Sequence, residues 1–380
     1  MRFLHKKIIF ISILFLSQFI SSDLAKLNVP EGFEISVFNN EIVNPRQMVE
    51  GDDYIFVGSR SAGNVYAIKK DNSSKSILLL EGLNLPNGVA LHEGNLYIAE
   101  IDKILVIKNI EQRMSLGTGF VAEVFFDDLP RNGMWNPMKR GWHGWKWIDF
   151  GPDGNLYIAE GVPCNVCDEE DERFGTILKL SDNNLSIYAD GVRNSVGFDW
   201  HPISGEMYFT DNGRDWMGDD IPPCELNKVE YEGEHFGFPY IHGADVEDDG
   251  FKIPEGFEFS KPVWNFQAHT APVGMKFYNG SMFPDRYKNG IFVAQHGSWN
   301  RPAGKVGYRV LFLKTNDGLV ESSEVFIDGW LEGETSWGAP AAPLVLRDGS
   351  MLISDDRSNQ IFKVQNENSP KNFGVFSLLK

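Results

Sequence analysis

One strand-turn-strand pattern recurs six times along this chain, and it constrains the fold more than any other feature of the sequence. Each copy has an apolar strand, a glycine-containing turn and a second apolar strand, often followed by a third. The clearest copy contains Gly151-Pro-Asp-Gly154 and then a short apolar strand ending at Glu160. Repetition of this kind makes each copy a candidate blade of a β-propeller. The copies span Pro45–Lys70, Pro86–Lys108, His143–Leu180, Arg193–Val229, Ala271–Lys314 and Gly338–Val364.

The repeats predict an all-β fold, a six-bladed β-propeller with long loops over the central channel. Their strands alternate apolar and polar residues, or stay apolar between turn signals. Glycines in Glu93-Gly94, Gly154-Asn155 and Asp348-Gly349 can supply the positive φ that hairpin turns require. A unit of roughly 59 residues exceeds a minimal four-stranded blade and leaves room for loops. Seven blades is the main structural alternative.

The extra length falls in four segments that are rich in glycine, proline, aspartate and aromatic residues. Ligands of propellers usually lie over the central channel, so we expect these segments to wall a binding site. We find no linker and no break in composition, which predicts a single propeller domain over residues 23–380. The four segments are Asn109–Gly141, Cys164–Phe174, Arg214–Phe259 and Gly297–Gly307.

Residues 1–22 have the pattern of a secretory signal peptide. Arg2, Lys6 and Lys7 form a basic start, and the apolar run Ile8–Ile20 is followed by small serines. The run is short for a membrane span, although an N-terminal anchor helix is the alternative. No other long apolar stretch follows, so we expect a mature chain without a membrane span, located in the periplasm or outside the cell.

The net charge restricts the class of partner. Removal of the signal leaves 32 basic residues against 53 acidic ones, a net charge of about −21. Repulsion of this size disfavours nucleic acid and anionic membranes as partners. The charge does not identify a substrate.

Three cysteines are present: Cys164, Cys167 and Cys224. Export makes a disulfide the expected state. Cys164 and Cys167 could close a small loop, or either could pair with Cys224 and leave one thiol over. Asp168 stands where a c-type haem motif needs histidine, and a four-cysteine zinc site lacks its fourth ligand. A structural disulfide that stabilises a loop is the preferred interpretation, ahead of redox catalysis by the cysteine pair.

Polar residues gather at the starts and ends of repeat strands, where a propeller converges on its axis. His143 opens the third repeat and is the candidate general base, because a histidine with a pKa near neutrality can accept a proton. His269 and His296 are weaker candidates. Each of these histidines could instead serve a structural hydrogen bond.

Arg193 and Asn194 open the fourth repeat and form a candidate binding pair. The arginine fork suits carboxylate or quinone oxygens, although a salt bridge between blades is the alternative. The acidic loop Asn212–Asp220 offers carboxylate and carbonyl oxygens for calcium. Tryptophans in the same segments could stack on a flat ligand, and we expect half of them to lie in the core instead. They are Trp142, Trp145, Trp147, Trp216, Trp299 and Trp337.

At these residues the chain resembles the soluble glucose/sorbosone dehydrogenase family, six-bladed propellers that bind pyrroloquinoline quinone (PQQ), and it is most similar to the sorbosone-dehydrogenase-like branch. His143 stands eight residues before Gly151, as the family's catalytic histidine does. Gly191-Val-Arg-Asn194 resembles the family's cofactor-contacting segment. The stretch Asn212–Pro239 resembles its calcium loop. The likeness covers about Pro30–Val364.

The resemblance implies a PQQ- and calcium-dependent sugar dehydrogenase. His143 would take the proton of the anomeric hydroxyl of an aldose or sorbosone-like sugar, while hydride passes to PQQ. Carbonyls of Gly213 and Arg214 would bind calcium, and Arg193 would stabilise charge on the quinone oxygens. An external acceptor, such as a quinone, a cytochrome or a dye, would reoxidise the cofactor. Further candidate PQQ contacts are Asn194, Arg214, Trp299, Arg301, Lys305 and Arg309.

One departure from the family concerns the last repeat. The family often has arginine in a Trp-Gly-Arg-Pro segment, and this chain has Ala339 there. Loss of that cation would forfeit a charge-assisted contact of about 1.5–3 kcal/mol. Two alternatives therefore stand beside the dehydrogenase: a lactonase-type propeller hydrolase with a metal on the channel axis, and a non-catalytic binding propeller.

Overall fold

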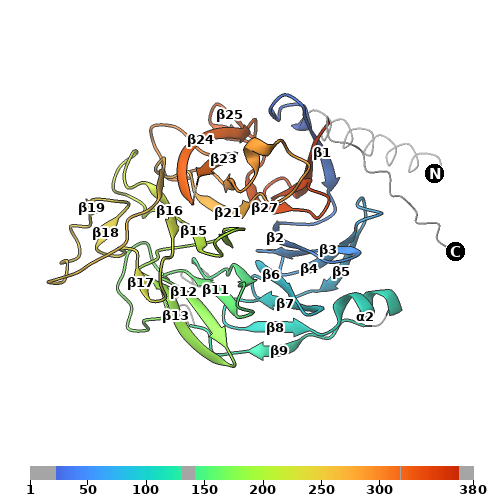
Figure 1. Ribbon diagram of the computed structural model, residues 1–380, viewed down its shortest axis with the longest axis horizontal. Helices are drawn as coiled ribbons and strands as arrows, with labels where there is room; N and C mark the ends of the chain where they lie inside the picture. Colours follow the sequence, from blue (N-terminus) through green and yellow to red (C-terminus); the bar gives the residue numbers. More distant parts are fainter. Residues whose placement is uncertain (1–22, 118, 131–141, 317, 368–380) are drawn as a thin grey trace, which may run out of the picture.

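The computed structural model describes residues 23–367 except 118, 131–141 and 317, and it has the six blades that the repeats predict. Six sheets of four or five strands follow one another around a ring in chain order (Figure 1). Their first strands face the axis, because β2 and β21 contact the inner strands of neighbouring blades. The first residues of these strands therefore converge at one end of the channel.

Blades one to three are built from consecutive antiparallel strands, and blade three gains an extra parallel strand, β17. Blade one contains β2 (Pro45–Glu50), β3 (Tyr54–Ser59), β4 (Val65–Lys69) and β5 (Ser76–Leu80). Blade two contains β6 (Gly88–His92), β7 (Asn95–Ala99), β8 (Ile104–Ile107) and β9 (Glu123–Phe126). Blade three contains β10 (Ile148–Phe150), β11 (Leu156–Glu160), β12 (Thr176–Ser181), β13 (Asn184–Asp190) and β17 (Glu234–His235).

Blades four to six complete the ring, and the last one borrows its outer strand from the start of the chain. Blade four contains β14 (Phe198–Trp200), β15 (Met207–Asp211), β16 (Cys224–Lys228) and β20 (Trp264–Phe266). Blade five contains β21 (Pro272–Phe277), β22 (Ile291–Gln295), β23 (Arg309–Asn316) and β24 (Leu319–Ile327). Blade six contains β27 (Pro340–Val345), β28 (Met351–Asp355), β29 (Gln360–Asn366) and β1 (Phe33–Asn39).

Pairing of β1 with β29 closes the ring. The two strands are antiparallel, with Phe33 opposite Asn366 and Val37 opposite Phe362. Because β1 comes from the other end of the chain, separation of blades one and six requires this sheet to come apart. The hydrogen bonds of one blade thus hold both ends of the propeller together.

Glycines form the predicted hairpin turns. Glu93 and Gly94 have φ of 48° and 75°, and they join β6 to β7 with His92 opposite Asn95. Two consecutive positive φ values are the mark of a type I′ turn, which matches the twist of the strands. Gly154 and Gly349 also have positive φ, at 77° and 83°.

The core lies between blades. Blade one meets blade six in a cluster that includes Met48, Ile55, Leu344 and Leu352. Similar apolar clusters fill the interfaces of the other neighbouring blades. Full burial of one such side chain contributes about 1.5–3 kcal/mol, so the ring is stabilised mainly by contacts between its blades.

Short elements interrupt the long segments between the blades. They are the helix α2 (Ile110–Leu116), the 3-10 turn η1 (Asp285–Tyr287), and the two-residue strands β18 (Ile241–His242), β19 (Val246–Glu247), β25 (Leu331–Glu332) and β26 (Thr335–Ser336). The β18–β19 hairpin projects from the rim of the disc (Figure 1).

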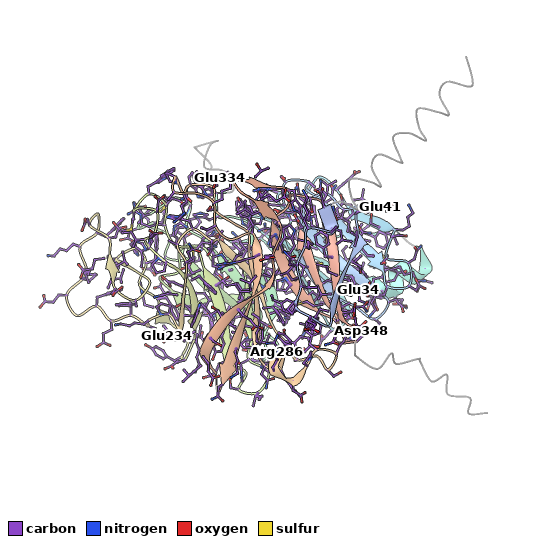
Figure 2. The ribbon with its side chains drawn as sticks, turned by 90° about the horizontal axis from the view of Figure 1, so that it is seen from above. Glu34, Glu41, Glu234, Arg286, Glu334 and Asp348 are labelled. Carbon is purple, nitrogen blue, oxygen red and sulfur yellow. A yellow bond between two sulfur atoms is a disulfide. The ribbon has the colours of Figure 1, made fainter. Side chains whose placement is uncertain are left out.

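The two faces of the disc differ in their loops. Glu334 lies on the face opposite Arg286 and Asp348 (Figure 2). Its carboxylate accepts a hydrogen bond from the main-chain N–H of Lys305, with N and O 3.1 Å apart. The long predicted loop Gly297–Gly307 therefore reaches the Glu334 face.

The described residues contain no helix long and apolar enough to cross a membrane. The predicted signal peptide, residues 1–22, lies outside them. Of the six singled-out tryptophans, Trp147 is buried between blades three and four, and Trp337 packs against the core of blades five and six. Trp216 and Trp299 are 65% and 68% exposed.

Candidate active site

A cavity of about 570 Å³ opens where the inner strands converge. Its lining comes from all six blades and the segments that lead into them, so only the closed ring assembles it. Four arginines line it, Arg46, Arg60, Arg193 and Arg357, together with His143, His269 and His296. Of the predicted cofactor contacts, Arg193, Asn194 and Trp299 lie in this wall, and so does Gly213.

His143 lies in the segment before β10, at the cavity wall, in a left-handed conformation with φ of 53°. Gly161, which follows β11, makes this position possible. A Cβ atom on Gly161 would stand 2.7 Å from the Cβ of His143 and 2.9 Å from Oδ1 of Asn194. The absence of a side chain at Gly161 thus lets His143 and Asn194 approach each other.

The hydrogen bonds of His143 define its tautomer. The indole N–H of Trp142 donates to Nε2 at 2.8 Å, and an indole can only donate. Nε2 therefore carries a lone pair, and Nδ1–H donates to the carbonyl of Val162 at 2.9 Å. Burial, with a contribution from the Arg193 charge, holds the pKa of His143 well below 6.5. The ring is neutral at pH 7, with its basic nitrogen at Nε2.

Arg193 is held rigidly by its neighbours. Its Nε donates to the carbonyl of Asn165 at 2.8 Å, and one terminal nitrogen donates to the carbonyl of Asn212 at 2.9 Å. The other terminal nitrogen contacts Oδ1 of Asn165 at 3.0 Å and the carboxylate of Asp215 at 3.5 Å. The guanidinium is a fixed positive charge rather than a mobile one.

Asn194 lines the cavity and is held there by its neighbours. Its main-chain N–H donates to Asp211 at 2.6 Å, and its carbonyl accepts from Asn212. Its side-chain Oδ1 is buried and has no partner within the described part of the chain. A buried acceptor without a partner costs about 1–3 kcal/mol.

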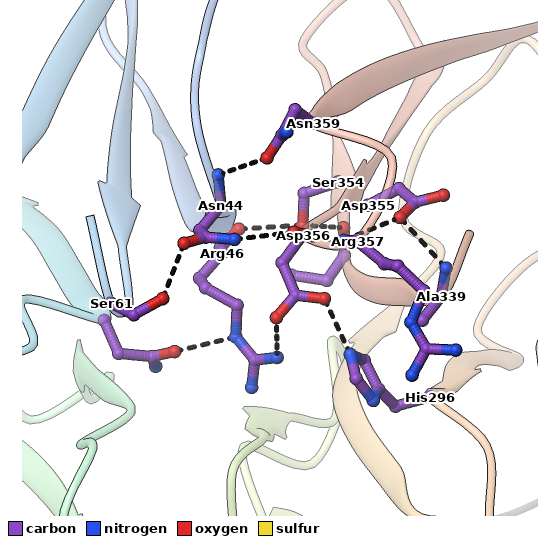
Figure 3. Close-up of polar contacts among 12 residues, drawn as sticks. Asn44, Arg46, Ser61, His296, Ala339, Ser354, Asp355, Asp356, Arg357 and Asn359 are labelled. Carbon is purple, nitrogen blue, oxygen red and sulfur yellow. Dashed lines mark hydrogen bonds and ion pairs between the residues drawn. The ribbon is translucent and has the colours of Figure 1, made fainter. Parts of the chain in front are cut away.

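A second polar group faces the cavity from blades one, five and six (Figure 3). Asp356, directly after β28, accepts from Nε2 of His296 at 2.7 Å and pairs with Arg46 at 3.0 Å. These partners hold the pKa of Asp356 well below its usual range, despite the opposing effect of burial. Arg46 also donates to Oδ1 of Asn87 at 2.9 Å.

Arg60 and Arg357 bring further positive charge. Arg60 stacks on the ring of Trp145 at 4.6 Å, and no ion pair or hydrogen bond to its guanidinium is found among residues 23–367 as described. Burial, with the charge of Arg46 as a further cause, lowers its pKa. Arg357 lies over Tyr308 and donates to the hydroxyl of Ser336.

Four predicted cations lie outside the cavity lining. Arg214 pairs with Asp248, and Arg301 binds the carboxylate of Asp220 and the carbonyls of Asp219 and Gly304. The ammonium of Lys305 lies 6.0 Å from the ring of Tyr308. Arg309 donates to Gln295.

Sequence reasoning missed Arg46, Arg60 and Arg357. Arg46 follows Pro45 at the start of a repeat strand, which is the position that drew attention to Arg193. Arg357 follows Asp355-Asp356, at the end of a strand of the sixth repeat. The same rule, applied evenly to every repeat, would have found these two.

The cysteines follow one of the predicted pairings. Cys164 and Cys167 form a disulfide, and Cys224 is free and buried beside the cavity. Burial raises the pKa of Cys224 to about 11, so it is a thiol at pH 7. In the described ranges, side-chain metal ligands gather at Cys164, Cys167 and Glu169, where the sulfurs are already bonded. The lactonase alternative, which needs a metal on the axis, gains no observation in its favour.

Comparison with known proteins identifies similar chains. Residues 134–297 match the family described as Glucose / Sorbosone dehydrogenase. An uncharacterized protein of Borreliella burgdorferi is 36% identical over 355 residues, which cover 90% of this chain and 91% of that one.

Three solved structures have a similar fold. A carbohydrate-active enzyme of Trichoderma reesei has a TM-score of 0.73 at 17% identity, with 90% of this chain and 97% of that one covered. The PQQ domain of pyranose dehydrogenase from Coprinopsis cinerea, in holo form, has 0.72 at 16%, covering 89% and 97%. A PQQ-bound aldose sugar dehydrogenase from Streptomyces coelicolor has 0.63 at 17%, covering 89% and 99%.

Proposed function

Because the chain belongs to the glucose/sorbosone dehydrogenase family, we propose that it is a PQQ- and calcium-dependent dehydrogenase. Its substrate is an aldose or a related, sorbosone-like sugar, which it oxidises at the anomeric hydroxyl. One observation supports this most: a buried, neutral histidine shares a cavity with four arginines. A proton acceptor beside concentrated positive charge suits a reaction in which a sugar loses a proton and a hydride.

The chemistry of the cavity wall fits PQQ. The cofactor carries three carboxylates and two quinone oxygens, so its site must provide cations and hydrogen-bond donors. Arg46 and Arg193 already have carboxylate partners, whereas Arg60 has none in the described ranges. We assign the carboxylates to the arginine wall. Asn194 stands in the same wall and would contact the ligand there.

Arg357 offsets the alanine at position 339. One carboxylate oxygen of Asp355 accepts from the N–H of Ala339 at 2.9 Å and from the N–H of Arg357 at 3.0 Å (Figure 3). The two residues are therefore neighbours at the end of blade six. Arg357 lines the cavity and so supplies a cation beside the position where the family often has one.

Calcium would bind to main-chain carbonyls of Gly213 and Arg214. Hard cations prefer oxygen ligands, and Gly213 lines the cavity next to Arg193. A Cβ on Gly213 would stand 2.6 Å from the carbonyl of Pro223, so this position requires glycine. Because the ligands are carbonyls, arginine at position 214 is compatible with the site.

His143 and Arg193 have different roles in the proposed reaction. His143 takes the hydroxyl proton at Nε2, after the sugar displaces the indole N–H of Trp142 from that atom. When bound, PQQ supplies the two-electron acceptor for the hydride that leaves the anomeric carbon. Arg193 provides fixed positive charge next to the site, and the same charge favours release of the proton from His143 to water.

Further parts of the proposal concern the surroundings of the enzyme. Trp216 and Trp299 pack edge to face, with their ring centroids 5.5 Å apart, and Trp299 borders the cavity as an apolar wall for a sugar ring.

We assign the protein to the periplasm or the extracellular space, because of its predicted signal peptide. Electrons leave to an external acceptor of the quinone, cytochrome or dye type.

Reconstitution tests the proposal. Purified protein is loaded with PQQ and calcium, and dye reduction is followed with a panel of aldoses. We expect sugar-dependent reduction that His143→Ala lowers by about a hundredfold or more, because a general base contributes that much. His92→Ala is the matched control, since His92 stacks on Phe150 at 4.1 Å, outside the cavity lining. Wild-type protein no faster than His143→Ala on every sugar would contradict the proposal.

A further inference from the structure

The disulfide loop lies at the edge of the cavity. Cys164 and Cys167 follow β11 and close a ring around Asn165 and Val166. The ring packs into a small apolar cluster with Val162 and Phe238, apart from the clusters that join the blades. Its position is therefore set both by a covalent bond and by packing.

Asn165 makes more contacts with the site than any other residue of this ring. Its carbonyl accepts from Nε of Arg193 at 2.8 Å, and its Oδ1 accepts from a terminal nitrogen of Arg193 at 3.0 Å. Oδ1 also accepts from the N–H of Asp215 at 2.8 Å, and Nδ2 donates to the carbonyl of Asp215 at 3.1 Å. One side chain thus joins the cation of the site to the acid that pairs with it.

These contacts account for much of the hydrogen bonding of Arg193. A guanidinium has five N–H donors, and two of the contacts that hold this one go to Asn165. Arg193 is 3% exposed, so water cannot simply replace a lost partner. Without the side chain of Asn165, the guanidinium would lose the contact to Oδ1 and would keep the carbonyls of Asn165 and Asn212 and the longer contact to Asp215.

We propose that Asn165 is a positioning residue of the active site, which fixes Arg193 and Asp215, and that the Cys164–Cys167 disulfide holds Asn165 in the place this requires. The proposal extends the function proposed above, because it assigns a role in that site to a loop outside the cavity lining. It also makes the site sensitive to reduction: two electrons and two protons from a dithiol reductant convert the disulfide into two thiols and free the ring.

The charge of Arg193 provides a direct readout in the protein without cofactor. Burial lowers the pKa of His143 most, and the charge of Arg193 lowers it further. Among the other cations and histidines of the cavity wall, Arg60 stacks on Trp145, and each of the rest has a polar partner away from Asn165. These groups are Arg46, Arg60, Arg357, His269 and His296, and the cavity wall also holds the titratable Asp215 and Cys224. If Arg193 moves away, the pKa of His143 should rise towards 6.5. A loop that serves only stability would leave this titration unchanged.

The experiment compares Asn165→Ala with Asn155→Ala. Asn155 is the control because it lies in a turn of the same blade and bonds to Asp153, outside the cavity. The pKa of His143 is measured by NMR in the cofactor-free proteins, and PQQ affinity and turnover are measured in the loaded ones. We expect Asn165→Ala to raise the pKa of His143 and to lower turnover by up to about a hundredfold, whereas Asn155→Ala matches the wild type.

Reduction of the wild-type protein provides a second measurement if Asn165→Ala folds poorly. Treatment with a phosphine reductant, checked by thiol counting, should raise the pKa of His143 in the same direction. An unchanged pKa in both arms would overturn the proposal. A shifted pKa in a protein that binds no PQQ would support the positioning role and count against the proposed function, so the two failures are distinguishable.

Discussion

Lys146 and Glu160 form an ion pair with both side chains fully buried, in the blade that carries His143. Nζ of Lys146 and Oε1 of Glu160 are 2.6 Å apart, and Oε2 of Glu160 has no partner among the described residues. Lys146→Met would remove the cation and leave the carboxyl group buried. The perturbation therefore isolates one charge in the interior without touching the cavity lining.

The expected cost is large. Loss of one partner from a buried pair costs about 3–5 kcal/mol of unfolding free energy, because the other charge stays uncompensated. The double variant Lys146→Met/Glu160→Leu should lie within about 2 kcal/mol of the wild type, since it removes both charges. Lys314→Met is the matched control: Lys314 and Glu321 are also 2.6 Å apart but exposed, so the loss should be below about 1 kcal/mol.

The penalty should depend on pH. Burial raises the pKa of Glu160 from 4.5 to about 7, against the opposing effect of Lys146. Folding then favours the protonated acid, so this group's contribution to stability falls as pH rises from about 4.5 to 7. Without Lys146 the pKa rises further and the loss continues above pH 7. The deficit of Lys146→Met should thus be larger at pH 8 than at pH 5.

Urea denaturation at the two pH values measures these differences. A Lys146→Met protein as stable as the wild type at pH 8 would refute the reasoning, because a buried charge would then have lost its partner at no cost. A double variant as unstable as the sum of its single variants would also refute it, since the two residues would then act independently.

The remaining predictions concern the cavity. Gly161→Ala should lower turnover about tenfold or more and lower the free energy of unfolding by about 1–3 kcal/mol, because the added Cβ would displace His143. Wild-type turnover in a folded variant would contradict this placement of His143. The pH profile of kcat/KM should stay flat below pH 6.5, because the lowered pKa of His143 keeps the base unprotonated; a midpoint at or above 6.5 would argue against His143 as the base. Arg357→Ala should weaken PQQ binding about tenfold to a hundredfold in calorimetry, and Ala339→Arg in that background should restore it; no loss would show that Arg357 does not bind the cofactor.

Repetition made the fold predictable. Each repeat carries its own strands and turns, so local patterns such as Glu93-Gly94 were sufficient to place the hairpins. Closure of the ring was not predictable in the same way. The strand Phe33–Asn39 lies outside the repeats, and its pairing with Gln360–Asn366 depends on contacts between the two ends of the chain.

The site was predictable where it follows the repeats. His143, Arg193 and Asn194 stand at the starts of inner strands, and the structure brings them to one cavity. Arg214 and Arg301 stand in long insertions, where side-chain direction depends on partners. Arg214 pairs with Asp248, and Arg301 pairs with Asp220, both outside the cavity lining. A sequence pattern cannot reveal such pairs.

Asn165 shows a further limit. The short Cys164–Cys167 spacing indicated a staple, but nothing in the sequence linked the residue between the cysteines to Arg193. That link appears only when blades three and four lie side by side, so that a loop after β11 meets the segment before β14.

Titration of PQQ into the purified protein, with calcium present, tests the central claim most directly. Absorbance and calorimetry would follow the binding in parallel. The arrangement of His143 and the arginine wall predicts saturable uptake of one PQQ per chain, with a change in the quinone spectrum that a reducing sugar then bleaches. A flat calorimetric trace and an unchanged spectrum at every calcium concentration would contradict it.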